Sequence, residues 1–324
     1  MKVIQCVAFG PPEDLRVEEV DDPLIQPGCV RVDVRACGVY FVDALMVQGL
    51  YQFRPTPPFV PGTEVAGVVA EVGEGVTDFS VGDAVMGAPG MNAFAEQAIV
   101  PVRALRLIPK GLSFAQASGF YQAYSTAYFA LVHRARLQPG ETVLILGAAG
   151  GVGLSAIDVA KAMGARVIAA ASTHEKLELC RAQGADEVIL YSEEDLKSRA
   201  KELSGGGVNV IYDPVGGEFA EPALRSVAPE GRYLVIGFAG GEIPRVPWNL
   251  ILLKQCQVIG VNWGGWTMSH REENEALFAS LREWMEAGRL KPVEPTLYPL
   301  EDLPQSLRGL LDRKIVGKAA LSLE

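Results

Sequence analysis

Short apolar runs alternate with amphipathic segments through the middle of the chain. Between residues 113 and 135 the spacing of apolar residues predicts helices, with Ser113 capping the first of them. Six apolar runs follow, and the segments 151–164 and 175–184 between the early runs have helical spacing. Because strands that alternate with helices are typical of a parallel sheet, this pattern predicts a doubly wound α/β domain. The six predicted strands are residues 142–147, 166–171, 187–191, 208–213, 232–237 and 257–263.

The first hundred residues follow a different pattern, in which short alternating runs are separated by Gly and Pro. Runs such as 29–36 and 64–73 predict an antiparallel β unit, which we expect to form a partly closed barrel. Near the C-terminus an amphipathic helix is predicted over 272–288, followed by a shorter helix and a last strand. This tail has too few strands for a domain of its own, so we expect it to return to the barrel. The predicted domains are residues 1–122, 123–264 and 265–324, the last of which completes the first.

Composition narrows the classes of partner. The 324 residues are 49% hydrophobic and 21% charged, as in ordinary globular proteins, and the net charge is −10. This acidic balance argues against nucleic acid or an anionic membrane as a partner. No run reaches the roughly 18–20 uncharged apolar residues that a membrane span needs. The five cysteines are odd in number, and no two have the C-x-x-C spacing, which argues against a disulfide framework and favours a cytoplasmic location.

The segment LILGAAGGVGLSA places a glycine-rich turn between the first strand of the α/β domain and the helix after it. Gly147 ends the strand, Gly150 lets the backbone approach a pyrophosphate, and Gly153 lets the helix pack closely against the strand. The N–H groups at the start of the helix, including those of Gly151 and Val152, then face the phosphates. This order of strand, turn, helix and next strand predicts a dinucleotide-binding site.

The end of the second strand lacks the acidic residue that holds the ribose hydroxyls of NAD. Ser172 lies there instead, 22 positions after Gly150 (172 − 150), and is followed by Thr173 and Lys176. A carboxylate would repel a 2′-phosphate, whereas hydroxyls and an ammonium group bind one. We therefore predict NADPH as the coenzyme, with Tyr191 at the end of the third strand stacking on the adenine. The alternative is that Ser172 or Thr173 only caps a helix and that Lys176 is solvated.

Six motifs spread along the chain carry a family resemblance. They are CGVYFVDALMVQGLY, PFVPGTEVAGVVAEVGEGVTDFSVGDAV, LILGAAGGVGLSAIDVAKAMGA, AQGADEVILY, VIYDPVGG and GKAAL. As a set they resemble the medium-chain dehydrogenase/reductase superfamily, and within it the zinc-free quinone oxidoreductase (zeta-crystallin) branch. The resemblance implies a six-stranded Rossmann sheet joined to a GroES-like barrel that carries the catalytic residues.

Zinc alcohol dehydrogenases of this superfamily have a Cys and a His at two positions that match Tyr40 and Thr63 here. Neither Tyr nor Thr is a usual zinc ligand. The four-cysteine zinc loop of those enzymes is also missing, since no cysteine lies between Cys37 and Cys180. We therefore predict that the chain binds no metal. Without a Lewis acid to hold an alkoxide, hydride transfer from NADPH to a quinone or an activated C=C bond is the remaining chemistry.

The resemblance also implies where the coenzyme and the acceptor bind. The nicotinamide is expected in the cleft between the two domains. The coenzyme-binding residues predicted in addition to those above are Thr126, at the start of the helix that leads to the sheet, Gly237, Phe238, Val261 and Trp263 after the last strands, and Arg313 in the tail, with Lys318 as a second candidate cation.

Three residues of the barrel are predicted to be catalytic. Tyr51, in the GLY motif of the family, is expected to hydrogen-bond the acceptor oxygen and to donate a proton; the alternative is that it is only a half-buried aromatic of the barrel. Tyr40 takes the place of the usual Asn, so it either replaces a hydrogen bond of that Asn or blocks part of the pocket. Asp43 either acts there or caps a turn, and Phe53, Trp263 and Trp266 are candidates for stacking on a flat acceptor.

Three other functions stay open on the sequence alone. The same scaffold and coenzyme serve an enoyl or alkenal reductase, because both reactions deliver hydride to a conjugated system. A binding or structural role and a zinc alcohol dehydrogenase are the more distant alternatives. The family tends to form homodimers through edge strands, and the apolar segment 246–263 is the expected edge.

Overall fold

The chain forms two compact units in the computed structural model, which describes residues 1–323. The first unit contains Met1–Gln122 and the chain from Val293 onward, and the second contains Ala123–Pro292. We expected the return to the barrel to begin at residue 265, but residues 265–292 belong to the second unit. The reason is that the helix after residue 270 buries Leu277, Phe278 and Leu281 within that unit.

The second unit is built on a parallel sheet with the strand order β10-β9-β8-β11-β12-β13. In order of sequence this is 3-2-1-4-5-6, the arrangement of doubly wound dinucleotide-binding folds, so the predicted sheet is confirmed. Its inner strands are continuous apolar runs because helices cover both faces of a parallel sheet. The strands are β8 (Thr142–Leu146), β9 (Arg166–Ala171), β10 (Glu187–Leu190), β11 (Val208–Asp213), β12 (Val227–Val235) and β13 (Gln257–Gly260).

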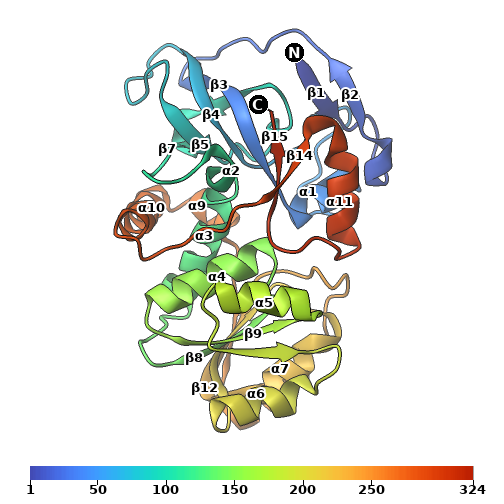
Figure 1. Ribbon diagram of the computed structural model, residues 1–324, viewed down its shortest axis with the longest axis vertical. Coiled ribbons are helices and arrows are strands. Elements are labelled where there is room, and N and C mark those ends of the chain that lie inside the picture. Colours follow the sequence, from blue (N-terminus) through green and yellow to red (C-terminus); the bar gives the residue numbers. More distant parts are fainter. Residues whose placement is uncertain (324) are drawn as a thin grey trace. The chain divides into compact units, whose positions relative to one another are not determined.

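The helices of this unit connect the strands and bury the faces of the sheet. Helix α4 packs on β8 and β9 and α5 packs on β9 and β10, side by side in Figure 1, whereas α6 and α7 pack against each other. Leu144, Leu146 and Ile168 form one core with residues of α6 and α7. The helices are α3 (Tyr121–Tyr128), a π-helical turn (Phe129–Arg134), α4 (Gly151–Ala162), α5 (His174–Ala182), α6 (Leu196–Ser204), the 3-10 turn Gly217–Phe219, α7 (Ala220–Ser226), α8 (Trp248–Lys254), α9 (Trp263–Thr267) and α10 (Arg271–Glu286).

The apolar segment 246–263, expected to be an edge strand, is only partly a strand. Residues 248–254 form α8, and only Gln257–Gly260 extend the sheet as β13. Pro247 precedes the helix, and Gln255 adopts a left-handed conformation that ends it. A short apolar run does not reveal its own period, and here burial of Leu250 against the sheet decides for a helix.

The first unit is mainly antiparallel, with the strand order β14-β15-β3-β4-β5-β7, and β6 pairs with β3 as well. The long strand β3 therefore bonds to β4, β6 and β15 along its length, which curves the sheet into the expected barrel-like unit. The elements are β1 (Lys2–Gln5), β2 (Arg16–Glu19), β3 (Cys29–Val39), α1 (Phe41–Val47), β4 (Val65–Val72), β5 (Ala84–Gly87), β6 (Gln97–Pro101), β7 (Leu105–Leu107), α2 (Phe114–Ala117), β14 (Thr296–Pro299), α11 (Leu303–Leu311) and β15 (Ala319–Ser322), with 3-10 turns at Pro12–Asp14, Val102–Ala104 and Leu300–Asp302.

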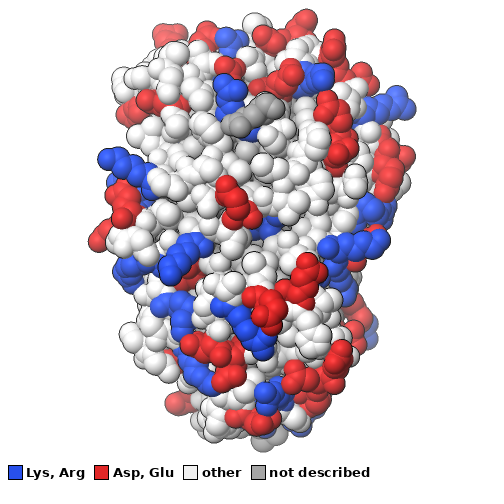
Figure 2. Space-filling model, in the orientation of Figure 1, with Lys and Arg blue, Asp and Glu red and all other residues white. Residues whose placement is uncertain are grey.

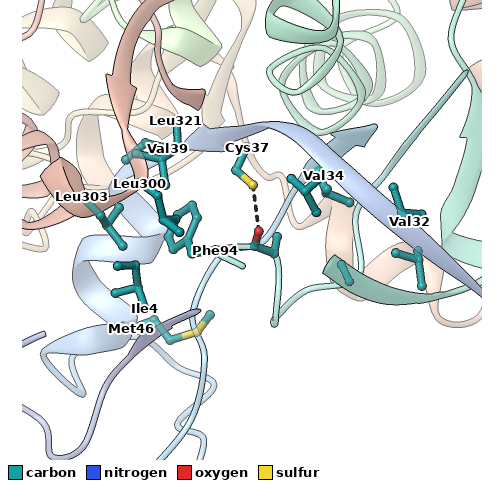
Figure 3. Close-up of a cluster of buried hydrophobic side chains, with 14 of the residues drawn as sticks. Ile4, Val32, Val34, Cys37, Val39, Met46, Phe94, Leu300, Leu303 and Leu321 are labelled. Atoms are coloured by element: carbon teal, nitrogen blue, oxygen red, sulfur yellow. Dashed lines mark hydrogen bonds between the residues drawn. The ribbon is translucent and has the colours of Figure 1, made fainter. Parts of the chain in front are cut away.

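The core of the first unit joins residues from both ends of the chain. Figure 3 shows Ile4, Val39 and Phe94 together with Leu303 and Leu321 from the C-terminal segment. Cys37 lies in this core, and its thiol donates a hydrogen bond to the carbonyl oxygen of Ala93 at 2.7 Å. The C-terminal segment thus completes the barrel, because β15 pairs with β3 and α11 packs on α1.

Charged side chains of both signs are mixed on the surface. On the face that Figure 2 shows, acidic and basic side chains are interspersed, and no large area of one sign stands out. Within residues 1–323, none of the helices combines the length and the apolar character that crossing a membrane requires.

Candidate functional site

The glycine-rich turn after β8 has the geometry that the sequence predicts. Gly147 has φ of +55°, and Gly150 is the N-cap of α4, which begins at Gly151. A Cβ atom on Gly153 would lie 2.6 Å from the carbonyl oxygens of Gly147 and Ala148, so only glycine lets the helix come this close to the strand. The first N–H groups of α4, at Gly151 and Val152, have no side-chain cap and can bind phosphate.

Ser172 and Lys176 lie together at the end of β9. The ammonium group of Lys176 donates to the Ser172 hydroxyl at 3.4 Å, and both side chains are half-buried. Thr173 is the N-cap of α5, and its hydroxyl accepts the Lys176 N–H at 3.3 Å, so the predicted capping role also exists. This pairing offers a cation and a hydroxyl, with no carboxylate at the strand end, and it suits a phosphate on the ribose.

Tyr191 lies next to the Ser172–Lys176 pair. Its N–H donates to the carbonyl oxygen of Ala171 at 3.2 Å, which holds it beside Ser172, and its ring packs against Phe219 with the centroids 4.3 Å apart. The half-buried ring is backed by protein on one side, so it can form one wall of an adenine pocket.

Three other predicted coenzyme-binding residues of this unit lie at the carboxyl ends of strands, whereas Thr126 and Trp263 differ from the expectation. Gly237 and Phe238 follow β12, and Val261 follows β13. Thr126 lies inside α3 rather than at its start, because the helix already begins at Tyr121. The indole of Trp263 is buried and donates to the side-chain oxygen of Asn274 at 3.0 Å. The Trp263 ring therefore cannot stack on an acceptor, and only its backbone is left to bind the coenzyme.

The two candidate cations of the C-terminal segment differ in exposure. Arg313 follows α11 with φ of +58° and is exposed. Lys318 is only 7% exposed, and its ammonium group donates to the carbonyl oxygen of Gly119 at 2.7 Å. The alternative role of Lys318 as a phosphate-binding cation is therefore wrong, because its charge is used inside the barrel.

Tyr40 lies in the first unit, at the junction between β3 and α1, where its ring is closely enclosed. A Cβ atom on Gly38 would come within 2.8 Å of the Tyr40 ring, and one on Gly119 would lie 3.9 Å from the Tyr40 hydroxyl. Gly38 thus leaves space that this ring fills, whereas the distance at Gly119 is an ordinary van der Waals contact. The ring takes the position of a zinc-ligating cysteine in the zinc alcohol dehydrogenases of the superfamily.

The hydroxyl of Tyr40 bonds to a carboxyl group that the sequence analysis overlooked. It donates to Oε2 of Glu64 at 2.5 Å, and the Gln122 N–H donates to the same oxygen at 3.2 Å. Glu64 is completely buried, and Oε1 has no hydrogen-bond partner within residues 1–323. Burial raises the pKa of Glu64 to about 8, although the Tyr40 bond and the Lys318 charge act against it. The only sequence signal was an acidic residue beside Thr63 at the start of an otherwise apolar strand.

Asp43 has a structural role in this arrangement. It is fully buried, and its Oδ2 accepts the Tyr40 N–H at 2.8 Å, which caps the first turn of α1. Burial raises the pKa of Asp43 to about 7, and the bond from Tyr40 lowers it. Asp43 therefore holds the backbone of Tyr40 and has no surface to offer a substrate, so its assignment as a catalytic residue is wrong.

The remaining aromatic candidates lie in different settings. Tyr51 follows α1, is half-buried and packs against the barrel core, while Phe53 is 54% exposed. In the second unit, Trp266 lies between Phe129 and His270, with ring centroids 4.7 and 5.0 Å away. Within residues 1–323 there is no cluster of three or more His, Cys, Asp or Glu side chains that is arranged to hold a metal.

Comparison with known proteins identifies the family. The model of the alcohol dehydrogenase GroES-like domain matches residues 26–135, and that of the zinc-binding dehydrogenase matches residues 151–281. The chain is 43% identical over 316 residues to quinone oxidoreductase-like protein 2 of Bos taurus, covering 96% of this chain and 89% of the relative. The chain belongs to the quinone oxidoreductase family. The resemblance to this branch of the medium-chain dehydrogenase/reductase superfamily is thereby confirmed.

Solved structures of quinone oxidoreductases and their relatives have the same fold. The crystal structure of a probable oxidoreductase from Mycobacterium abscessus has a TM-score of 0.89 and 38% identity over 99% of this chain and 98% of that one. Escherichia coli quinone oxidoreductase complexed with NADPH has a TM-score of 0.90 and 31% identity over 99% and 100% of the two chains. The expected combination of a six-stranded Rossmann sheet and a GroES-like domain is confirmed.

Proposed function

We propose that this chain is an NADPH-dependent reductase that transfers hydride to quinones without a metal ion. The observation that carries the proposal is the contact between Lys176 and Ser172 at the end of β9, where a phosphorylated ribose meets a cation instead of a carboxylate. The quinone oxidoreductase family and the NADPH complex of the Escherichia coli relative support it. The coenzyme, when bound, supplies the hydride, and the protein orients it and excludes water.

Independence from zinc is part of the proposal. Tyr40 and Thr63 are at the two positions that supply zinc ligands in alcohol dehydrogenases, and the Tyr40 hydroxyl is engaged with Glu64. Because neither side chain is a usual ligand, the protein has no means there of stabilising an alkoxide. An acceptor that is already electron-poor needs no such help, which fits a quinone.

The coenzyme-binding set comprises the amides of the Gly150 turn, the Ser172–Lys176 pair, Tyr191 and the backbone after β12 and β13. Each belongs to the carboxyl edge of the parallel sheet, where doubly wound folds bind their ligands. Arg313 and Thr126 stay in the set as expectations from the family resemblance. Tyr51 and Tyr40 are proposed to contact the acceptor.

We further infer a homodimer in the cytoplasm. Strand β13 bonds to β12 only, so it forms an edge of the sheet, and the neighbouring α8 exposes Trp248, Leu252 and Leu253 by 75–82%. An apolar surface of this kind at a sheet edge is expected to be covered by a second copy. All five cysteines are free and buried, which is consistent with a reducing compartment.

Steady-state kinetics with a panel of acceptors tests the function. Purified protein is given NADPH or NADH together with benzoquinones, naphthoquinones, enones and enoyl thioesters. We expect kcat/KM to be highest for NADPH with a quinone. Faster reduction of enones or enoyl thioesters would favour the double-bond reductase, and a preference for NADH would contradict the proposed coenzyme. Metal analysis finding one tightly bound zinc per chain would contradict the zinc-free mechanism.

A further inference from the structure

The Tyr40–Glu64 pair connects a buried carboxyl group to a half-buried side chain of the barrel unit. Glu64 is completely buried, and Tyr40 is half-buried. The two oxygens that join them lie 2.5 Å apart, which is short enough for direct proton transfer. A hydroxyl on a half-buried side chain with a buried acid behind it has the arrangement of a proton donor that can be protonated again.

We propose that Tyr40 donates the proton that completes reduction of the acceptor, and that Glu64 returns a proton to Tyr40. The inference rests on the proposed hydride transfer to a quinone. A quinone that receives a hydride gains two electrons and one hydrogen, and it needs one further proton to become a hydroquinone. The proposal supplies that proton from the chain itself.

The transfer balances in atoms and charge. The Tyr40 O–H bond breaks as a new O–H bond forms on the reduced quinone, and the Glu64 O–H bond breaks as its proton moves to the Tyr40 oxygen. Tyr40 ends neutral, and Glu64 ends as a carboxylate. One proton from solvent restores Glu64, so each turnover consumes NADPH, a quinone and one proton.

The surroundings of Glu64 favour the protonated form that this transfer requires. Glu64 is completely buried and its Oε1 has no hydrogen-bond partner within residues 1–323, which disfavours the carboxylate. This agrees with a pKa of about 8. In the protonated form the proton lies on Oε2 and is donated to the Tyr40 oxygen, so that the Tyr40 O–H turns to the acceptor. The titratable groups that act on the pair are Lys318, which lowers the pKa of Glu64, and Asp43, which raises that of Tyr40.

Close packing and hydrogen bonds fix the position of the Tyr40 side chain. Gly38 provides space for it, Asp43 fixes its backbone N–H, and the Glu64 bond fixes its hydroxyl. Lys318 is held by Gly119 nearby and provides a positive charge for the carboxylate formed in the transfer. Tyr51, the other candidate donor, packs against the barrel core, and it serves as the comparison in the test.

Four variants separate the relay from a structural role. Tyr40→Phe removes the hydroxyl and keeps the ring, and Glu64→Gln keeps the size of the side chain and its bond to Tyr40. Tyr51→Phe tests the competing donor, and Tyr298→Phe on β14 is the matched control. The pH dependence of kcat and its solvent deuterium isotope effect are measured with NADPH and the best quinone.

For the wild type we expect kcat to fall as pH rises through about 8, because only protonated Glu64 can return a proton to Tyr40. Tyr40→Phe should lower kcat by about 10²-fold or more with little change in KM, the usual contribution of a positioned proton donor. Both Tyr40→Phe and Glu64→Gln should lose the fall near pH 8, while Tyr298→Phe keeps it. Infrared spectra of the wild type should show a protonated carboxyl band that disappears above that pH and is missing in Glu64→Gln.

Each other outcome overturns the relay. It is wrong if Tyr40→Phe retains kcat within twofold and keeps the fall near pH 8, or if Tyr51→Phe alone produces the loss. A Glu64 carboxyl that is ionised at pH 6 in the infrared spectrum rejects it even where a variant fails to fold. If the wild type reduces no acceptor with NADPH, both the proposed function and the relay are contradicted. If the wild type turns over normally and Tyr40→Phe does so too, only the relay is contradicted.

Discussion

Replacing Lys176 by alanine should separate the two nicotinamide coenzymes. The ammonium group lies beside the Ser172 hydroxyl in a half-buried position, so its charge is only partly screened by water. Two unit charges about 4 Å apart interact by about 4 kcal/mol at an effective dielectric constant of about 20. Solvent and side-chain ordering reduce this to the roughly 1.5–3 kcal/mol of a hydrogen bond to a charged group.

A loss of roughly 1.5–3 kcal/mol corresponds to a fall of about 10- to 160-fold in kcat/KM for NADPH. NADH has no 2′-phosphate, so its kcat/KM should change by less than about threefold if only that phosphate contacts the lysine. The assay is initial-rate kinetics at constant ionic strength, with Lys201→Ala as the control. Lys201 carries the same charge in the last turn of α6, away from the carboxyl edge of the sheet.

Two results would refute this reasoning. An equal loss with NADPH and NADH would mean that Lys176 serves the fold or a part shared by both coenzymes. An equal loss in Lys201→Ala would mean that net charge, rather than a local contact, governs NADPH binding. Calorimetric titration of each coenzyme without an acceptor gives the same comparison independently of turnover.

Three further changes test the fold around the site. Tyr212→Phe should raise the free energy of unfolding by about 1 kcal/mol, because this buried hydroxyl has no hydrogen-bond partner within residues 1–323. Tyr233→Phe removes the donor to the Asp213 carboxylate and should lower the free energy of unfolding by about 1–3 kcal/mol. Denaturant titrations measure both changes. Gly153→Ala should abolish coenzyme binding or prevent folding, since its Cβ would lie 2.6 Å from two carbonyl oxygens; unchanged NADPH affinity by calorimetry would contradict the turn geometry. Leu252→Glu on α8 should convert the proposed dimer to a monomer in light scattering, and a dimer that persists would show that another surface is used.

The order of the elements was predictable because it depends on local patterns. Strands buried on both faces are continuous apolar runs, and the glycines of the 147–153 turn follow from the close approach of α4 to β8. The prediction from sequence was wrong for two segments whose structure depends on tertiary packing. Residues 248–254 form a helix because Leu250 packs against the sheet, and residues 265–292 stay with the second unit because α10 buries its apolar face there.

The sequence alone reveals the contact between the proposed coenzyme-binding residues Ser172 and Lys176, but not the contact that holds Tyr40. Ser172 and Lys176 are four positions apart across a helix start, so a sequence spacing brings them together. Tyr40 and Glu64 come from different elements 24 residues apart, and only the pairing of β3 with β4 makes them neighbours. Packing between segments far apart in the sequence also gives Lys318, a charged residue that looks solvated in the sequence, a buried partner at Gly119.

Glu64 differs from the buried acid Asp213 in a way that predicts its effect on stability. Asp213 uses both oxygens, accepting from Val215, Gly216 and Tyr233, which makes its burial tolerable. Glu64 leaves one oxygen without a partner within residues 1–323, and its pKa is raised to about 8. A carboxyl group whose folded-state pKa is raised contributes stability at low pH, and this contribution is lost as pH rises toward the folded value.

Glu64→Gln cannot ionise, so it should lose less stability than the wild type between pH 6 and pH 9, although it turns over more slowly. The measurement is the Tm of both proteins at each pH, and Asp43 titrates in both, so its effect cancels in the comparison. If Glu64 lowers the free energy of unfolding at alkaline pH and still raises kcat, it is a proton donor that is kept for function. Functional sites retain groups that the fold alone would not favour. Equal pH dependence in the two proteins would instead mean that Glu64 is already ionised at pH 6 and is a structural anion.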